Sequence, residues 1–221
     1  MFYIIGDSTA ATKSPEQKPQ SGWGEYLYLF LGAKKEAVVN LAVNGRSTKS
    51  FLAENRFTEL LRVLQPDDTV FIQFGHNDEK VRDPARYTDP FGVFSENLIY
   101  FVTQIQSKNA TPILLTPQAR RNFKENILVD THGDYLKAVY QTAEKTNVTL
   151  LDANQFSMNL LRQMGPQNSV VLFNHLAYGE SPNYPEGVGD NTHFSILGAH
   201  LFAEGIARMY VDYKNAEIAG D

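Results

Sequence analysis

The chain begins MFYIIGDST (Met1–Thr9), an apolar run that ends in a glycine and three polar residues. A short continuous apolar run is typical of a strand that is buried on both faces of a parallel sheet, because neither side of such a strand meets solvent. Four more runs of this kind follow along the chain. The five predicted strands are 2–5, 37–42, 69–74, 111–116 and 148–152.

Helical spacing of apolar residues occupies much of the chain between these runs. The predicted helices are 23–31, 57–64, 94–106, 135–144 and 195 to about 213. Strands that alternate with helices form a parallel sheet with right-handed crossovers. We therefore predict an α/β fold, a three-layer α/β/α sandwich whose five-stranded parallel sheet has the flavodoxin-like order 2-1-3-4-5. Because no linker or internal repeat interrupts the chain, a single domain over 1–221 is expected.

Composition excludes several classes of protein. The 221 residues include no cysteine, which excludes disulfides, thiolate metal ligands and cysteine nucleophiles. The formal net charge of −5 argues against a nucleic-acid partner, because such proteins usually present a basic face. No apolar run approaches the ~18 residues of a membrane span, so no membrane partner is expected. Since no signal-peptide pattern precedes the first strand, we expect a cytoplasmic protein, or a secreted one if the sequence starts at a mature end.

Ligands of an open parallel sheet bind beyond the carboxyl ends of its strands. Three long connections are expected to wall a site at this edge, because each follows a strand end or precedes the last polar motif. They are 79–92, 117–134 and 165–191.

A candidate nucleophile and its base stand at opposite ends of the chain. Ser8 lies just past the first predicted strand, and a serine hydroxyl becomes a nucleophile when a base removes its proton. His193 is the candidate base, and an ordinary imidazole pKa of ~6.5 suits a base near neutral pH. Asp190, in a loop that leads into the last predicted helix, is spaced to bind Nδ1 of His193 and hold its tautomer. We therefore predict Ser8, Asp190 and His193 as catalytic residues.

Two further motifs offer hydrogen-bond donors near Ser8. Gly45 follows the second strand, and a glycine lets its N–H approach a ligand closely. Asn77 follows the third strand and offers a side-chain amide. With the N–H of Ser8, these groups are predicted to form an oxyanion hole for a tetrahedral intermediate.

Each motif taken alone has a simpler interpretation. Asp7 and Ser8 are typical of a turn or a helix start, and Asn44-Gly45 is typical of an ordinary turn. Asp190 and His193 are also compatible with a capped turn and an ordinary loop residue. A metal site formed by this pair with His175 or His200 is a weaker alternative, because the usual metal-binding spacings are missing. The four motifs in this order, three of them directly after strands, favour acyl transfer.

Together these motifs resemble those of the SGNH hydrolases, the "GDS" esterases and lipases, and within them the rhamnogalacturonan acetylesterase family. The resemblance covers nearly the whole chain. It rests on Gly6–Thr9, Gly22–Gly24, Asn44–Ser47, Phe74–Asp78, Thr116–Arg121, Thr131–Asp134 and Asp190–Ser195. It implies a serine esterase that removes O-acetyl groups from galacturonic acid units of rhamnogalacturonan, through an acetyl-enzyme intermediate and without a metal or cofactor.

The implied partner is an acetylated acidic oligosaccharide. Arginine can bind a uronate carboxylate through two parallel hydrogen bonds, and the expected wall segments are rich in cations. The predicted substrate-binding residues are Arg46, His76, Arg120, Arg121, His132 and His175. Alternatives that remain open are an acetylesterase for another glycan such as xylan, a short-chain lipase or thioesterase, and a non-catalytic carbohydrate-binding relative. The sequence leaves the oligomeric state open.

Overall fold

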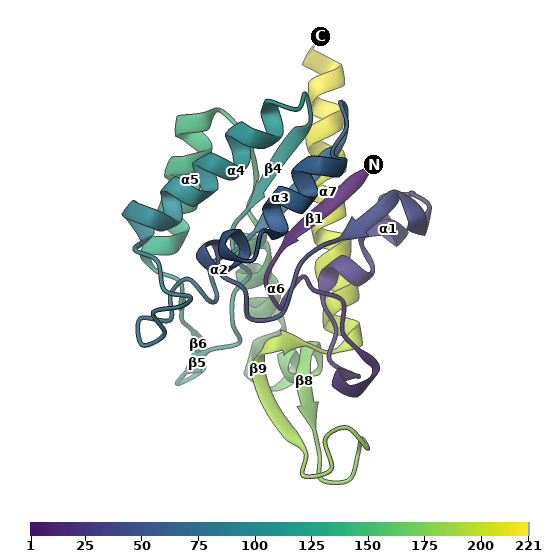
Figure 1. Cartoon of the computed structure of the whole chain (residues 1–221). Coiled ribbons are helices and arrows are strands. Elements are labelled where there is room, and N and C mark those ends of the chain that lie inside the picture. Colours follow the sequence, from purple (N-terminus) through teal and green to yellow (C-terminus); the bar gives the residue numbers. More distant parts are fainter. Residues whose placement is uncertain (221) are drawn as a thin grey trace.

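A computed structural model describes residues 1–220. Its centre is a parallel five-stranded sheet in the order β2-β1-β3-β4-β7 (Figure 1). The strands are β1 (Phe2–Gly6), β2 (Val38–Asn40), β3 (Thr69–Gln73), β4 (Thr111–Leu115) and β7 (Thr149–Leu151). Because β7 is the fifth strand of this sheet along the chain, the predicted order is confirmed.

Helices cover both faces of the sheet, which confirms the three-layer architecture (Figure 1). One layer holds α2 (Thr48–Ala53), α3 (Arg56–Val63), α4 (Ser95–Gln106) and α5 (Asp134–Thr146). The other holds α1 (Leu27–Phe30), α6 (Ala153–Asn168) and α7 (Ile196–Gly220). Single turns of 3-10 or π helix lie at Pro15–Gln17, Trp23–Glu25, Lys35–Ala37, Pro90–Phe94 and Ser169–Leu172. Of the helices within residues 1–220, none combines the length and apolarity that a bilayer crossing requires.

Successive side chains of β1 enter two different cores, because side chains of a strand alternate between the faces of its sheet. Ile4 lies in the cluster that includes Leu161 of α6 and Phe202 of α7. Ile5 lies in the cluster that includes Leu60 of α3 and Phe101 of α4. Both isoleucines are fully buried. Burial on both faces is the reason that this strand has a continuous apolar sequence.

The structure differs from the sequence-based prediction in several elements. The predicted helix 23–31 is a 3-10 turn followed by the short helix α1, and α2 and α6 were not predicted. The connection 165–191 is not a loop throughout, because it includes the end of α6, all of β8 (Phe173–Leu176) and the start of β9 (Val188–Phe194). The connection 117–134 contains the small hairpin of β5 (Phe123–Lys124) and β6 (Ile127–Leu128).

The β8–β9 hairpin projects from the body of the molecule at the edge where the strands of the central sheet end (Figure 1). Its sequence is mostly polar, because most of its side chains are only partly buried, and it therefore lacks the apolar pattern by which a strand is recognised. Asp190 and His193 lie on β9 rather than in a loop, which corrects the prediction. The hairpin thus extends the wall of the site and also carries two of its residues.

Candidate active site

Ser8 lies in a tight turn directly after β1. The carbonyl of Asp7 accepts hydrogen bonds from the N–H groups of Ala10 and Ala11, which closes the turn. The Asp7 carboxylate accepts from the N–H of Thr9 at 2.9 Å and from its hydroxyl at 2.8 Å. These contacts hold the backbone on both sides of Ser8. Ser8 itself is 8% exposed.

Ser8, His193 and Asp190 form a hydrogen-bonded chain. Oγ of Ser8 lies 2.8 Å from Nε2 of His193, and Nδ1 of His193 lies 2.7 Å from Oδ2 of Asp190. Because a carboxylate only accepts hydrogen bonds, Nδ1 of His193 carries the proton and donates it. Nε2 is then left as the acceptor for the hydroxyl of Ser8. The structure thus brings the three predicted residues together across 185 positions of sequence.

The Asp190 carboxyl is ionised over the whole neutral range. Its partial burial alone would raise its pKa, but the hydrogen bond and charge of His193 outweigh this effect. The N–H groups of Thr192 and His193 also donate to Oδ1 at 2.8 and 3.0 Å. Together these contacts lower the pKa of Asp190 to about 2. The carboxylate can therefore stabilise an imidazolium at His193.

The docking of β9 against the body sets the position of His193. Phe194, the next residue, is fully buried and stacks on Phe202 of α7 with ring centroids 4.2 Å apart. The carbonyl of Phe194 accepts a hydrogen bond from the N–H of Ser21 at 3.0 Å. Because Phe194 is anchored in the core, its neighbour is held at the sheet edge beside Ser8.

Gly45 and Asn77 lie in neighbouring loops after β2 and β3. Gly45 has a φ of +76°, a conformation that side-chain-bearing residues rarely adopt. Nδ2 of Asn77 donates to the carbonyl of Arg46 at 3.1 Å, which ties the two loops together. An amide nitrogen carries two hydrogens, so this bond leaves one for a ligand.

Arg86 is a residue of this site that was not predicted as such. Its Nη1 donates to Oδ1 of Asn77 at 3.3 Å and would lie 3.6 Å from a Cβ placed on Gly45. Its Nε donates to Asp83 at 2.6 Å. The sequence placed Arg86 in a long connection rich in cations, but only the fold shows that its guanidinium lies next to both Asn77 and Gly45.

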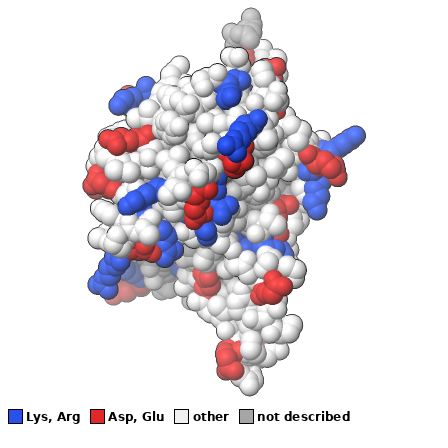
Figure 2. All heavy atoms as spheres, viewed as in Figure 1, with Lys and Arg blue, Asp and Glu red and all other residues white. Residues whose placement is uncertain are grey.

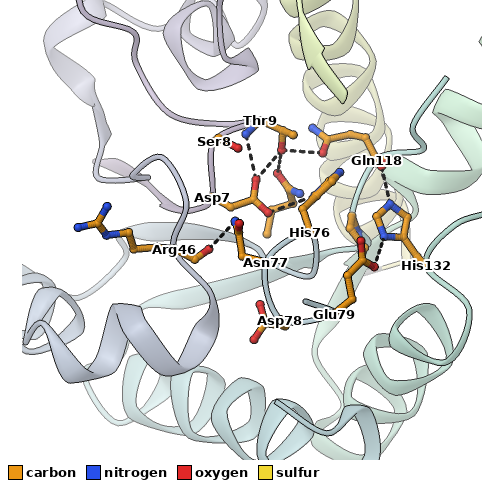
Figure 3. A network of polar contacts seen from close by, with 12 residues as sticks. Asp7, Ser8, Thr9, Arg46, His76, Asn77, Asp78, Glu79, Gln118 and His132 are labelled. Atoms are coloured by element: carbon orange, nitrogen blue, oxygen red, sulfur yellow. Dashed lines mark hydrogen bonds and ion pairs between the residues drawn. The ribbon is translucent and has the colours of Figure 1, made fainter. Parts of the chain in front are cut away.

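A buried carboxyl, Asp78, supports these loops from below (Figure 3). It accepts from the N–H and hydroxyl of Thr48 at 3.0 and 2.6 Å and from the hydroxyl of Thr88 at 2.9 Å. Burial raises the pKa of Asp78 to about 7 despite these hydrogen bonds. These hydrogen bonds therefore join the chain directly after Asn77 to the first turn of α2.

Two predicted substrate-binding histidines are buried within the protein (Figure 3). Nδ1 of His76 lies 3.1 Å from the Asp7 carboxylate, and burial lowers the pKa of its ring. His132 is held between Glu79, 3.0 Å from Nδ1, and the carbonyl of Gln118, 2.8 Å from Nε2. Because the nitrogens of His132 are both paired inside the protein, this position argues against contact with substrate. The ring of His76 thus braces Asp7, the neighbour of Ser8, whereas the ring of His132 joins Glu79 to the connection 117–134.

A family model described as "GDSL-like Lipase/Acylhydrolase" matches residues 2–206. The chain belongs to this family. The predicted class, a carboxylic ester hydrolase, is therefore confirmed. The arrangement at Ser8 suits an acylhydrolase, because it pairs a serine with an oriented histidine.

This GDSL-like acylhydrolase is similar to two proteins of Bacillus subtilis (strain 168). The probable rhamnogalacturonan acetylesterase YesY is 34% identical over 207 residues, which cover 94% of this chain and 90% of YesY. The rhamnogalacturonan acetylesterase RhgT is 35% identical over 218 residues, which cover 96% of this chain and 92% of RhgT. These similarities confirm the resemblance stated from the sequence motifs.

A solved structure of YxiM, also from Bacillus subtilis, has a similar fold. It superimposes on all of this chain with a TM-score of 0.80 and 25% sequence identity. This GDSL-like acylhydrolase spans 57% of the YxiM chain.

The predicted substrate-binding arginines of the acylhydrolase make contacts within the protein. Arg46 pairs with Glu54 at 3.0 Å, and its guanidinium points away from Ser8 (Figure 3). Arg120 pairs with Glu79 and donates to the hydroxyl of Thr131 at 3.0 Å. These contacts occupy much of each guanidinium.

Arg121 joins the connection 117–134 to the hairpin that carries His193. Its Nη1 donates to Oδ1 of Asn191 at 2.8 Å, and its backbone N–H donates to the carbonyl of Asn191 at 2.9 Å. Nε2 of His175 lies 2.9 Å from the same Oδ1, and His175 is half-buried. Arg121 and His175 therefore brace β9 next to Asp190, a role that the sequence pattern did not indicate.

The surface of the acylhydrolase carries charges of both signs. Figure 2 shows basic and acidic side chains interspersed over the face drawn there. Lys80 and Arg82, in the same connection as Arg86, are exposed. The acidic net charge of the chain is thus not concentrated on this face.

Proposed function

We propose that this protein is a serine carbohydrate O-acetylesterase that works through an acetyl-enzyme intermediate. The observation that carries the proposal is the pair of hydrogen bonds that links Ser8 to His193 at 2.8 Å and His193 to Asp190 at 2.7 Å. Membership of the acylhydrolase family supports the reaction type. The names of YesY and RhgT support an acetylated carbohydrate as the substrate.

The first half of the reaction transfers the acetyl group to the enzyme. Oγ of Ser8 attacks the acetyl carbonyl while Nε2 of His193 takes the hydroxyl proton, and Asp190 stabilises the imidazolium. The negative oxygen of the tetrahedral intermediate is bound by the N–H groups of Ser8 and Gly45 and by the amide of Asn77. The bond between acyl carbon and sugar oxygen then breaks, and His193 returns the proton to the sugar.

The second half releases acetate. Water gives a proton to His193 and attacks the acetyl carbonyl of acetyl-Ser8, and the same donors stabilise the second oxyanion. Collapse of this intermediate frees acetate, and the Ser8 oxygen recovers its proton from His193. The enzyme returns to its starting state, so one ester and one water give one alcohol, one acetate and one proton.

The proposed substrate is an acetylated rhamnogalacturonan oligosaccharide. This assignment rests on the names of the two relatives and on the cations of the connection 79–92. The test is acetate release from acetylated rhamnogalacturonan oligomers and from acetylated xylo-oligomers, with Ser8→Ala as the control. We expect the first substrate to be preferred and both activities to vanish in Ser8→Ala. Equal rates would overturn the pectin assignment, and activity in Ser8→Ala would overturn the mechanism.

A labelling experiment tests the nucleophile independently of the substrate. An organophosphonate that resembles the tetrahedral intermediate should attach to Ser8, and mass spectrometry of peptides identifies the site. Labelling at another residue, or none in a folded protein, would count against an esterase of this kind.

A further inference from the structure

Lys13 is a buried cation at the active site that the proposed reaction does not use. The residue is 4% exposed and follows the turn that holds Ser8. Its ammonium group donates to the carbonyl oxygen of Ser8 and, at 2.6 Å, to Oδ1 of Asn44. Lysine is rarely buried so fully, since its charge loses its hydration there.

These two acceptors belong to the two loops that supply backbone donors to the expected oxyanion hole. The peptide bond between Ser8 and Thr9 is held at both ends. Lys13 donates to the carbonyl of Ser8, and the Asp7 carboxylate accepts from the N–H of Thr9 at 2.9 Å. Asn44 is the residue before Gly45. The Lys13 ammonium therefore connects the Ser8 turn to the Gly45 loop across 31 positions of sequence.

We propose that Lys13 is a positioning residue for the oxyanion hole, because it fixes the N–H groups of Ser8 and Gly45 relative to each other and adds positive charge beside them. This proposal rests on the esterase function proposed above. An oxyanion hole needs donors that are arranged before the reaction, since reorganisation during the reaction would raise the barrier. A buried ammonium with two fixed acceptors provides such an arrangement.

The segment around Lys13 has other anchors. The carboxylate of Glu25 accepts from the N–H of Gly22 at 2.9 Å and pairs with Lys18 at 2.5 Å. It also lies 3.3 Å from the backbone N–H of Lys13, a contact that does not depend on the side chain. A variant without the Lys13 ammonium should therefore keep this segment in place.

The charge of Lys13 is sensitive to alkaline pH. Burial lowers its pKa to about 8, although several anions oppose this effect. The charged groups around it are Asp7, Glu25 and Asp190, which raise the pKa, and Lys18, which lowers it. Deprotonation of Lys13 should thus weaken the oxyanion hole as pH rises through about 8.

The test compares Lys13→Met with Lys18→Met, a matched variant of the same segment whose ammonium does not contact Ser8 or Asn44. The substrate is para-nitrophenyl acetate, whose leaving group needs no proton from His193. We measure kcat and KM from pH about 5 to about 9.5, with circular dichroism at each pH. We expect a fall of kcat on the alkaline side in the unchanged protein and in Lys18→Met.

In Lys13→Met we expect kcat at neutral pH to fall by about ten- to a hundredfold, less than the loss of a whole donor, with KM nearly unchanged. The alkaline fall should disappear in this variant. An unchanged kcat, or an alkaline fall that persists in Lys13→Met, overturns the proposal. If Lys13→Met does not fold, Lys13→Arg decides, because a permanent charge must remove the alkaline fall.

Failure of this proposal is distinguishable from failure of the proposed function. Phosphonate labelling of Ser8 in the unchanged protein tests the esterase function alone. If Ser8 is labelled and Lys13→Met reacts as fast as the unchanged protein, only the role of Lys13 is wrong. If Ser8 is not labelled at all, the esterase function itself fails.

Discussion

Nη1 of Arg86 lies 3.3 Å from Oδ1 of Asn77, and the amide nitrogen of Asn77 lies 3.1 Å from the carbonyl of Arg46. A guanidinium only donates and a carbonyl only accepts, so the two partners allow one orientation of the amide. The NH₂ group of Asn77 is thereby kept on the side of the Arg46 carbonyl, with its second hydrogen left for the predicted oxyanion. We propose that Arg86 influences the reaction by orienting Asn77.

Replacement of Arg86 should therefore impair the acetyl transfer itself. We expect Arg86→Ala to lower kcat on para-nitrophenyl acetate by about tenfold, because an amide free to rotate is a poorer oxyanion donor. Arg82→Ala, an exposed arginine of the same connection, is the control and should have little effect. If Arg86→Ala changes only KM for acidic oligomers, Arg86 binds substrate instead and does not orient Asn77.

Asp190→Asn should abolish most activity without unfolding the protein. The amide oxygen of Asn can still accept from the N–H groups of Thr192 and His193, but its NH₂ would face Nδ1 of His193. The ring would then carry its proton on Nε2, the wrong nitrogen for a base at Ser8. We expect kcat to fall by roughly 10³- to 10⁴-fold. A steady-state assay measures kcat, and a thermal unfolding scan checks that the protein stays folded. A decrease in kcat of less than tenfold would contradict the role of Asp190.

Asp78 should make the protein less stable as pH rises from about 4 to about 7. Its folded pKa of about 7 lies above the ordinary value of 3.8, so in this range the folded state binds a proton that the unfolded state has released. The free energy of unfolding that this carboxyl contributes is therefore largest below pH about 4 and declines as pH rises through about 7. Denaturant unfolding at several pH values measures this dependence in the unchanged protein and in Asp78→Asn.

The control for this experiment is the free energy of unfolding at pH values outside this window. Asp78→Asn should remove the decline between pH about 4 and about 7 but leave changes outside this window in place. Asp78→Ala should cost about 2 to 4 kcal/mol at neutral pH, since the donors of Thr48 and Thr88 lose their acceptor. Identical pH slopes in Asp78→Asn and the unchanged protein would show that another group is responsible.

Arg121→Ala separates a structural role from substrate binding. Its side chain binds Asn191, next to Asp190, at 2.8 Å. If this bond positions β9, the variant should lose about tenfold in kcat on para-nitrophenyl acetate as well as on acidic oligomers. Lys124→Ala, an exposed cation of the same connection, is the control. A loss confined to acidic oligomers would support the sequence-based prediction that Arg121 binds uronate.

The strands of the central sheet could be predicted because each has a largely continuous apolar sequence. β1, β3 and β4 are buried on both faces, whereas the edge strands β2 and β7 are mostly only partly buried. Ser8, Gly45 and Asn77 could be placed from the same pattern, since each follows a strand whose carboxyl end meets one edge of the sheet. β9 escaped prediction because it is a half-buried hairpin strand in which polar side chains dominate.

The residues that support the site could not be predicted, because their partners are far away in the sequence. Lys13 meets Asn44, and Asp78 meets Thr48. Nothing local distinguishes Lys13 from Lys18, although the first is buried and the second is partly exposed. The same reason explains why Arg121 was expected at the substrate: a charged loop residue gives no sign of its internal partners.

The proposed nucleophile and base belong to separate structural units. Ser8 follows the central sheet, whereas His193 and Asp190 lie on a hairpin whose contacts with the body include those of Phe194, Arg121 and Tyr184. A local opening of this hairpin would break the Ser8–His193 contact while the sheet stays folded, and local openings generally cost less free energy than global unfolding. Heat should therefore inactivate the enzyme reversibly at temperatures below those that melt its helices.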